Sequence, residues 1–205
     1  MQNCLEVIAD AVLQVVLFQV EADHNESYLV NPDATPLVQG VMLLIDLAKK
    51  KAALWSETEQ QQNQGKMIEL CHELHQVTIK IAEFLEKLKS DAYDQATKEE
   101  LLFAAKNCMV FTVHLMKLAD LYDVYHIEKS GGYYKNEQKK FLATEPRLFQ
   151  ENLQNYVISS VNLGKEVVGR ANYIVDSVMQ ERLNVFSSEL EVNYFFTLHS
   201  CLISF

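Results

Sequence analysis

The sequence predicts an all-α protein. Six glycines and three prolines are few for 205 residues, whereas all-β folds place many of both at turns. Hydrophobic residues make up 49% of the chain and charged residues 22%, the balance of an ordinary globular protein. Apolar side chains recur at steps of three and four, which is the spacing of one helix face. We therefore expect six helical segments with short connections, packed most simply as antiparallel bundles.

The first two segments are the candidates for binding a partner. The segment from Asn3 to about Ala22 is apolar nearly all round, so it needs burial on more than one side. Thr35 followed by Pro36 predicts the start of the second segment, which extends to Trp55. A partner's amphipathic helix could use the surplus apolar surface. The alternative is that the monomer itself buries both segments. The predicted partner-binding residues are Leu5, Ile8, Val12, Val15, Val16, Val38, Val41 and Ile45.

The third and fourth segments are expected to pair within the same bundle. The third has the cleanest period in the chain, an apolar seam from Met67 to Leu88. The Gln-rich stretch Gln60–Gly65 is the expected link before it, and the alternative is a continuous helix end that faces solvent. Thr97 with Glu100 matches a capping box, which predicts that the fourth segment starts there and continues to about Ile127.

The second half of the chain is expected to form a separate group of helices. Ser130-Gly131-Gly132 should break or fray the fourth segment, because glycine is a poor helix former. Thr144-Glu145-Pro146 starts a long segment that keeps its apolar stripe to Val178. A second capping box, Ser188 with Glu191, predicts a last helix over Val192–Phe205. The expected domains are a first bundle over 1–128, a linker or interrupted helix over 129–144, and second-bundle helices over 145–205.

The distribution of charge limits the classes of partner. The formal net charge is −10, and residues 1–48 hold seven carboxylates and no Lys or Arg. Nucleic acid and anionic membrane surfaces would be repelled, so a basic or mainly apolar protein segment fits better. The apolar run Ala11–Val20 is too short for a membrane span, so we expect no transmembrane segment. Four widely separated cysteines without a CxxC pair are typical of a reduced, cytosolic protein.

One cluster suggests metal chemistry. Glu69, His72, Glu73 and His75 lie within two helical turns, and Glu69-x-x-His72 has the spacing used by di-iron helical bundles. Such sites need a second motif of this kind, and the nearest candidate, Asp123-x-x-His126, carries the wrong acid. The expectation is therefore no enzyme, no cofactor and no metal site. A metal-binding helical-bundle enzyme stays the rival class.

A resemblance to a known family rests on the stretch Leu115–Tyr125, which has the sequence LMKLADLYDVY. It resembles a run of the form LADxxDVY in the amino-terminal domain of the alpha-catenin/vinculin family, closer to alpha-catenin. The flanking stretches LKSDAYDQATKEELLFAAKNCM and GRANYIVDSVMQERLNV are similar to the same domain. The residues that match the family motif are Leu118, Ala119, Asp120, Asp123, Val124 and Tyr125.

The resemblance implies both a fold and a role. The fold would be two conjoined antiparallel four-helix bundles joined through a long shared helix. The role would be a scaffold at cell-cell junctions that binds an amphipathic helix of a beta-catenin-like armadillo protein and can homodimerise. A vinculin-head-like receptor for talin or alpha-actinin helices is the alternative. The implied location is cytoplasmic, at junctions and the associated cytoskeleton.

Overall fold

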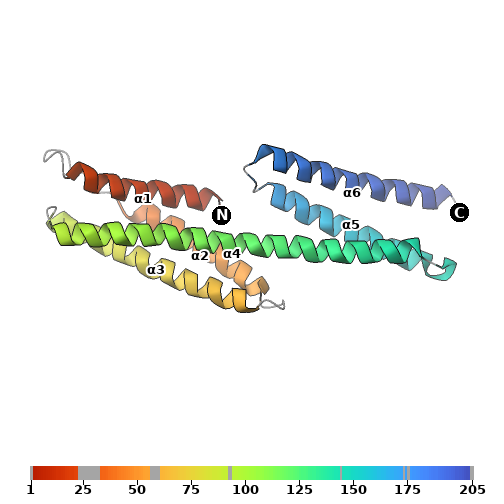
Figure 1. Ribbon diagram of the computed structural model, residues 1–205, viewed down its shortest axis with the longest axis horizontal. Helices are drawn as coiled ribbons and strands as arrows, with labels where there is room; N and C mark the ends of the chain where they lie inside the picture. Colours follow the sequence, from red (N-terminus) through yellow and green to blue (C-terminus); the bar gives the residue numbers. More distant parts are fainter. Residues whose placement is uncertain are drawn as a thin grey trace. The chain divides into compact units, whose positions relative to one another are not determined.

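All regular secondary structure in the described part of the chain is helical (Figure 1), which confirms the all-α prediction. The computed structural model describes the backbone of residues 2–22, 33–55, 61–91, 94–143, 145–172, 174 and 176–203. The helices are α1 (Gln2–Ala22), α2 (Thr35–Trp55), α3 (Gln61–Ser90), α4 (Gln95–Leu142), the 3-10 turn η1 (Pro146–Leu148), α5 (Phe149–Ala171) and α6 (Ser177–Ile203).

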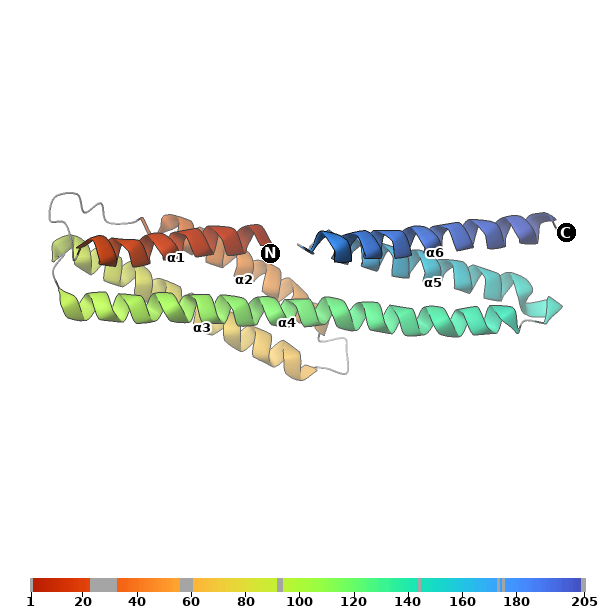
Figure 2. The same cartoon turned by 45° about the horizontal axis from the view of Figure 1, so that its top comes forward.

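The chain folds into two compact units. Unit 1 comprises Met1–Tyr122 and unit 2 comprises Asp123–Phe205, so the division falls earlier than the boundary expected at residue 128. In unit 1, α1 packs on α2 and α2 on α3, and each pair is antiparallel (Figures 1 and 2). In unit 2, α5 packs on α6, also antiparallel. Helix α4 contributes residues to both units.

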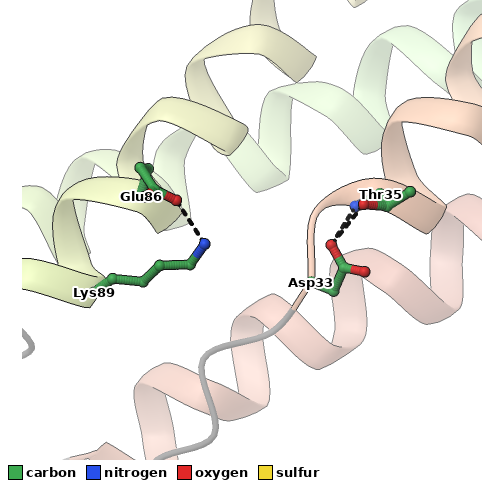
Figure 3. A network of polar contacts seen from close by, with 4 residues as sticks. All are labelled: Asp33, Thr35, Glu86 and Lys89. Carbon is green, nitrogen blue, oxygen red and sulfur yellow. Dashed lines mark hydrogen bonds and ion pairs between the residues drawn. The ribbon is translucent and has the colours of Figure 1, made fainter.

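Aspartate side chains cap three helix starts. Asp33 accepts hydrogen bonds from the Thr35 backbone N (2.9 Å) and Oγ1 (2.7 Å) at the start of α2, where the sequence predicted one (Figure 3). Asp94 accepts from Ala96 N and Thr97 N at 3.1 and 3.2 Å, so α4 begins before Thr97. The hydrogen bond from the Thr97 hydroxyl, followed by those from the backbone N–H groups, lowers the pKa of Asp94. Carboxylates are preferred at helix starts because their oxygens accept hydrogen bonds from the backbone N–H groups of the first turn, which have no partner within the helix.

Two predicted segment starts are wrong. The capping box Thr97 with Glu100 does not cap α4, because Asp94 occupies the capping position and Thr97 bonds to it. The box Ser188 with Glu191 lies inside α6, which starts at Ser177 and is capped by Asp176 through Val178 N at 2.9 Å.

The long segment expected to reach Val178 ends at Ala171. Residues 61–65 of the predicted Gln-rich link belong to α3.

The predicted interruption of the fourth helix does not occur. Helix α4 is continuous from Gln95 to Leu142 and includes Ser130-Gly131-Gly132, so the expected linker or interrupted helix over 129–144 is wrong. Two glycines lower helix stability by about 1 kcal/mol each relative to alanine. Tertiary contacts offset this: Phe141 stacks on Tyr156 of α5 with ring centroids 5.4 Å apart. The Ser130 hydroxyl also donates to Glu166 at 2.8 Å.

Unit 1 holds a large apolar core. The seam predicted along α3 is confirmed, since Met67, Leu74, Ile81 and Leu88 are fully buried. Trp55 at the end of α2 is also fully buried and meets Tyr122 of α4 edge to face, with ring centroids 5.1 Å apart. Helices α1 and α2 pack their inner faces into this core and expose their outer faces.

Candidate functional site

The residues predicted to bind a partner lie mainly inside unit 1. Five of them, on α1 and α2, are buried, and the other three are half-buried. In this folded unit the five buried side chains form core and not an open groove, because their faces pack inward. Their role in partner binding stays a prediction that would require unit 1 to open. The buried five are Ile8, Val12, Val15, Val41 and Ile45, and the half-buried three are Leu5, Val16 and Val38.

A second apolar stripe lies on the outside of the same helices. On α1, Val7, Leu13 and Leu17 are exposed, and on α2 Met42 and Leu43 are exposed. The partner-binding residues that the sequence predicts on α1 are the buried and half-buried ones, and Val7, Leu13 and Leu17 are not among them. The outer stripe can be traced in the sequence, because Leu13 and Leu17 are four residues apart. Asp10 and Glu6 continue this helical spacing toward the start of α1.

The two helices approach closely where the outer stripe meets α2. A Cβ atom placed on Gly40 of α2 would lie 3.1 Å from Val7 Cγ1 and 3.2 Å from Ile8 Cγ1 of α1. Only glycine leaves room for this spacing without displacing those side chains. Val7 therefore sits directly against the α2 backbone at Gly40.

Two residues of the LADLYDVY motif, Ala119 and Tyr122, pack against α2. Ala119 is buried, and its carbonyl accepts a hydrogen bond from Lys51 Nζ of α2 at 3.1 Å. The same ammonium group lies 5.9 Å from the centre of the Tyr122 ring, within range of a cation–π contact. Of the other motif residues, Val124 is exposed, and Leu118, Asp120, Asp123 and Tyr125 are half-buried.

The core of unit 2 contains buried polar groups. Glu137 of α4 is only 1% exposed; its Oε1 accepts from Lys140 Nζ at 2.6 Å, and its Oε2 has no hydrogen-bond partner. Tyr134 and Tyr156 share a hydrogen bond of 3.3 Å between their hydroxyls. Burial is the main cause that raises the pKa of Tyr134 to about 12. These groups give unit 2 a polar interior beside a small apolar cluster of Leu163, Val167 and Leu190.

The residues considered for metal binding lie mostly on the surface of α3. Glu69, His72 and Glu73 are exposed on α3 and His75 is half-buried. Among the residues that the structure describes, no three His, Cys, Asp or Glu side chains lie close enough to hold a metal ion. Cys4, Cys71 and Cys108 are free and buried. Burial raises the pKa of the Cys108 thiol to about 11, so at neutral pH it is protonated and a poor nucleophile.

One described helix has the length and composition to cross a membrane. It is α4, which contains an 18-residue window of mean hydropathy 1.3, one third of it buried in the fold. The core helix of a soluble protein passes the same test, so this is weak evidence for a membrane span.

Comparison with known proteins identifies no relative. No protein-family model matches the chain, and neither does any curated protein or any solved structure.

Proposed function

We propose that this chain is a binding module of the alpha-catenin/vinculin type and not an enzyme. Its role would be to bind an amphipathic helix of a beta-catenin-like armadillo protein at cell-cell junctions, on the cytoplasmic side and linked to the cytoskeleton. The chain would also homodimerise. The proposed architecture is two conjoined antiparallel four-helix bundles, of which unit 1 supplies the surface for the partner.

The observation that carries the proposal is the long helix α4. It is continuous over Gln95–Leu142 and gives residues to both compact units. The family resemblance implies a shared helix of this kind, and the LADLYDVY stretch lies in it at the division between the units. Ala119 and Tyr122 of that stretch contact α2, so these two motif residues have a structural role in unit 1.

A second observation favours a binding role. Helix α1 buries one apolar face in unit 1 and exposes another. Exposed apolar stripes rimmed by polar residues are typical of interaction surfaces. The vinculin-like alternative, a receptor for talin or alpha-actinin helices, would use the same surface and differ only in the partner.

The direct test is titration with fluorescently labelled helices, read by anisotropy. The helices come from a beta-catenin-like armadillo protein, from talin and from alpha-actinin, and each is compared with a scrambled version. Selective binding of the armadillo-protein helix supports the proposal, and selective binding of a talin or alpha-actinin helix supports the alternative. Failure of all three, or stoichiometric iron or zinc in the purified protein, would overturn both.

A further inference from the structure

The outward stripe of α1 combines apolar and acidic side chains. Glu6, Asp10, Leu13 and Leu17 follow one another at steps of four, three and four, so they lie along one line of the helix, and Val7 lies beside it. All five are exposed: Leu13 by 54%, Leu17 by 47% and Val7 by 43%. We call these five residues the acidic face of α1.

Apart from Val7, which also packs against α2 at Gly40, this face is separate from the side of α1 that builds the core. Cys4, Ile8, Ala11, Val12 and Val15 are buried against the rest of unit 1. Helix α1 therefore buries its inner face within unit 1, and Leu13 and Leu17 lie outside that core. Single exposed apolar residues are ordinary on protein surfaces. Here, however, they are aligned at helical spacing between carboxylates.

The carboxylates on this side of unit 1 are uncompensated. Within the described part of the chain, Glu6 and Asp10 of α1 and Asp46 of α2 have no ion-pair partner. The sequence places no Lys or Arg anywhere in residues 1–48. The potential over this face is therefore negative and is not neutralised locally, which attracts a cationic partner and repels an anionic one.

Helix α2 carries a similar pair of exposed residues. Val7 lies against the α2 backbone at Gly40, and Leu43, one turn further along α2, is 55% exposed. Asp46 follows Leu43 by three residues and is also exposed. The neighbouring helix thus repeats the combination of an exposed leucine and an exposed carboxylate.

We propose that the acidic face of α1 binds a basic amphipathic helix. That helix would present apolar side chains at steps of three and four to Val7, Leu13 and Leu17, with Lys or Arg flanking them opposite Glu6 and Asp10. The inference rests on the proposed function, because it specifies the chemistry of the partner helix at unit 1.

The test uses an 18-residue labelled peptide with leucines at helical spacing and lysines beside them. Two matched peptides carry glutamine or glutamate in place of every lysine. Each is titrated against the full chain by fluorescence anisotropy at about 0.05 and 0.5 M salt, over which charge screening becomes strong. The variants are Leu13→Ala and Asp10→Asn, and circular dichroism checks that both remain folded.

Matched controls come from other exposed positions of unit 1. Leu102→Ala on α4 removes a leucine that is 46% exposed, and Glu69→Gln on α3 removes an exposed carboxylate. Neither residue belongs to the acidic face of α1. Both control variants should bind the lysine peptide like the unaltered chain.

The lysine peptide is expected to bind about tenfold more tightly than the glutamine peptide at low salt, because charge complementarity favours it. Leu13→Ala should weaken binding about fivefold, and Asp10→Asn about threefold with a flatter salt dependence. Equal binding of the three peptides, or equal loss in the control variants, would contradict the inference. So would a dimer, measured by sedimentation, that the Leu13→Ala variant no longer forms.

The two proposals can fail separately. If the armadillo-protein helix binds but the lysine peptide has no advantage, the charge inference fails and the proposed function stands. If the lysine peptide binds at the acidic face of α1 while none of the three natural helices binds anywhere, the proposed function fails and the surface assignment stands.

Discussion

The two units of the molecule are built from the same kind of helix but have different interiors. Of the largest fully buried side chains in the described part, all but one lie in unit 1, and all of those are apolar. The exception is Glu137 in unit 2. Burial of apolar area is the main favourable contribution to folding, and a buried carboxylate with one oxygen that lacks a hydrogen-bond partner opposes it. The comparison predicts that unit 1 is the stable half and unit 2 the labile half.

The largest expected effect is two-step unfolding. Trp55, the only tryptophan in the chain, lies in the core of unit 1, so its fluorescence reports that unit alone. Circular dichroism reports helix in both units. In urea, we expect ellipticity to fall in two steps and fluorescence to follow only the second. Coincident curves from the two probes would contradict independent units of different stability.

A core substitution can assign the second step. Leu74 is fully buried in α3, so Leu74→Ala should destabilise the fluorescence-detected step by about 3 kcal/mol. The first step should not move, because the substitution lies in the other unit.

The second prediction concerns the buried carboxylate of unit 2. Replacing Glu137 by leucine should stabilise the first step by about 1–3 kcal/mol, because a buried charge with one unpaired oxygen gives way to apolar surface. Glu137→Gln, which removes only the charge, should have a smaller effect. The measurement is the urea midpoint of the first step. A loss of stability with Glu137→Leu would show that this carboxylate supports unit 2.

A third, smaller effect contrasts two helical glycines. A Cβ added at Gly131 meets no atom within 4 Å, so Gly131→Ala should stabilise unit 2 by about 0.5–1 kcal/mol. The same change at Gly40 would meet Val7 and Ile8 and should destabilise unit 1 by about 1 kcal/mol. Opposite shifts of the two unfolding steps are the expected result. Stabilisation by both substitutions would show that α1 moves aside easily.

The last effect is confined to alkaline solution. The pKa of Cys108 in unit 1 rises from 9.0 to about 11, and that of Tyr134 in unit 2 from 10.0 to about 12. In each case the unfolded chain loses its proton first, so stability falls as the pH rises through that interval. Unit 1 should weaken between about pH 9 and 11, and unit 2 between about pH 10 and 12.

Urea midpoints measured from pH 8 to 11.5 test this order. Cys108→Ala should reduce the dependence of the second step, to which Cys71 also contributes because burial raises the pKa of its thiol, and Tyr134→Phe should remove the dependence from the first step. A first step that weakens below pH 10 in the Tyr134→Phe variant would assign the dependence to another group.

The sequence predicted features that depend on a single helix. The seam of α3 and the start of α2 at Thr35 follow from periodicity and local chemistry, so both appear in the structure. The start of α4 was misplaced because an S/T-x-x-E pattern and an aspartate three residues earlier are both good caps. The glycine break was misjudged because the contacts of Phe141 and Ser130 with α5 are remote in sequence.

The candidate surface could be located on α1 from the sequence, but not its orientation. Apolar residues nearly all round a helix do not reveal which face the rest of the chain covers. The structure buries Ile8, Val12 and Val15 and leaves Leu13 and Leu17 outside. The acidity of that region was visible in the sequence, whereas its alignment with the exposed leucines required the packing of α1.

The division of α4 between the units has a consequence for synthesis on the ribosome. Unit 1 ends at Tyr122, partway along the helix, so its residues are complete while residues 123–205 are still to be translated. Translation at about 5–20 residues per second leaves several seconds for that remainder, whereas helical bundles fold in microseconds to milliseconds. Unit 1 can therefore fold first. The rest of α4 then extends from it during translation, and the later helices assemble on that extension.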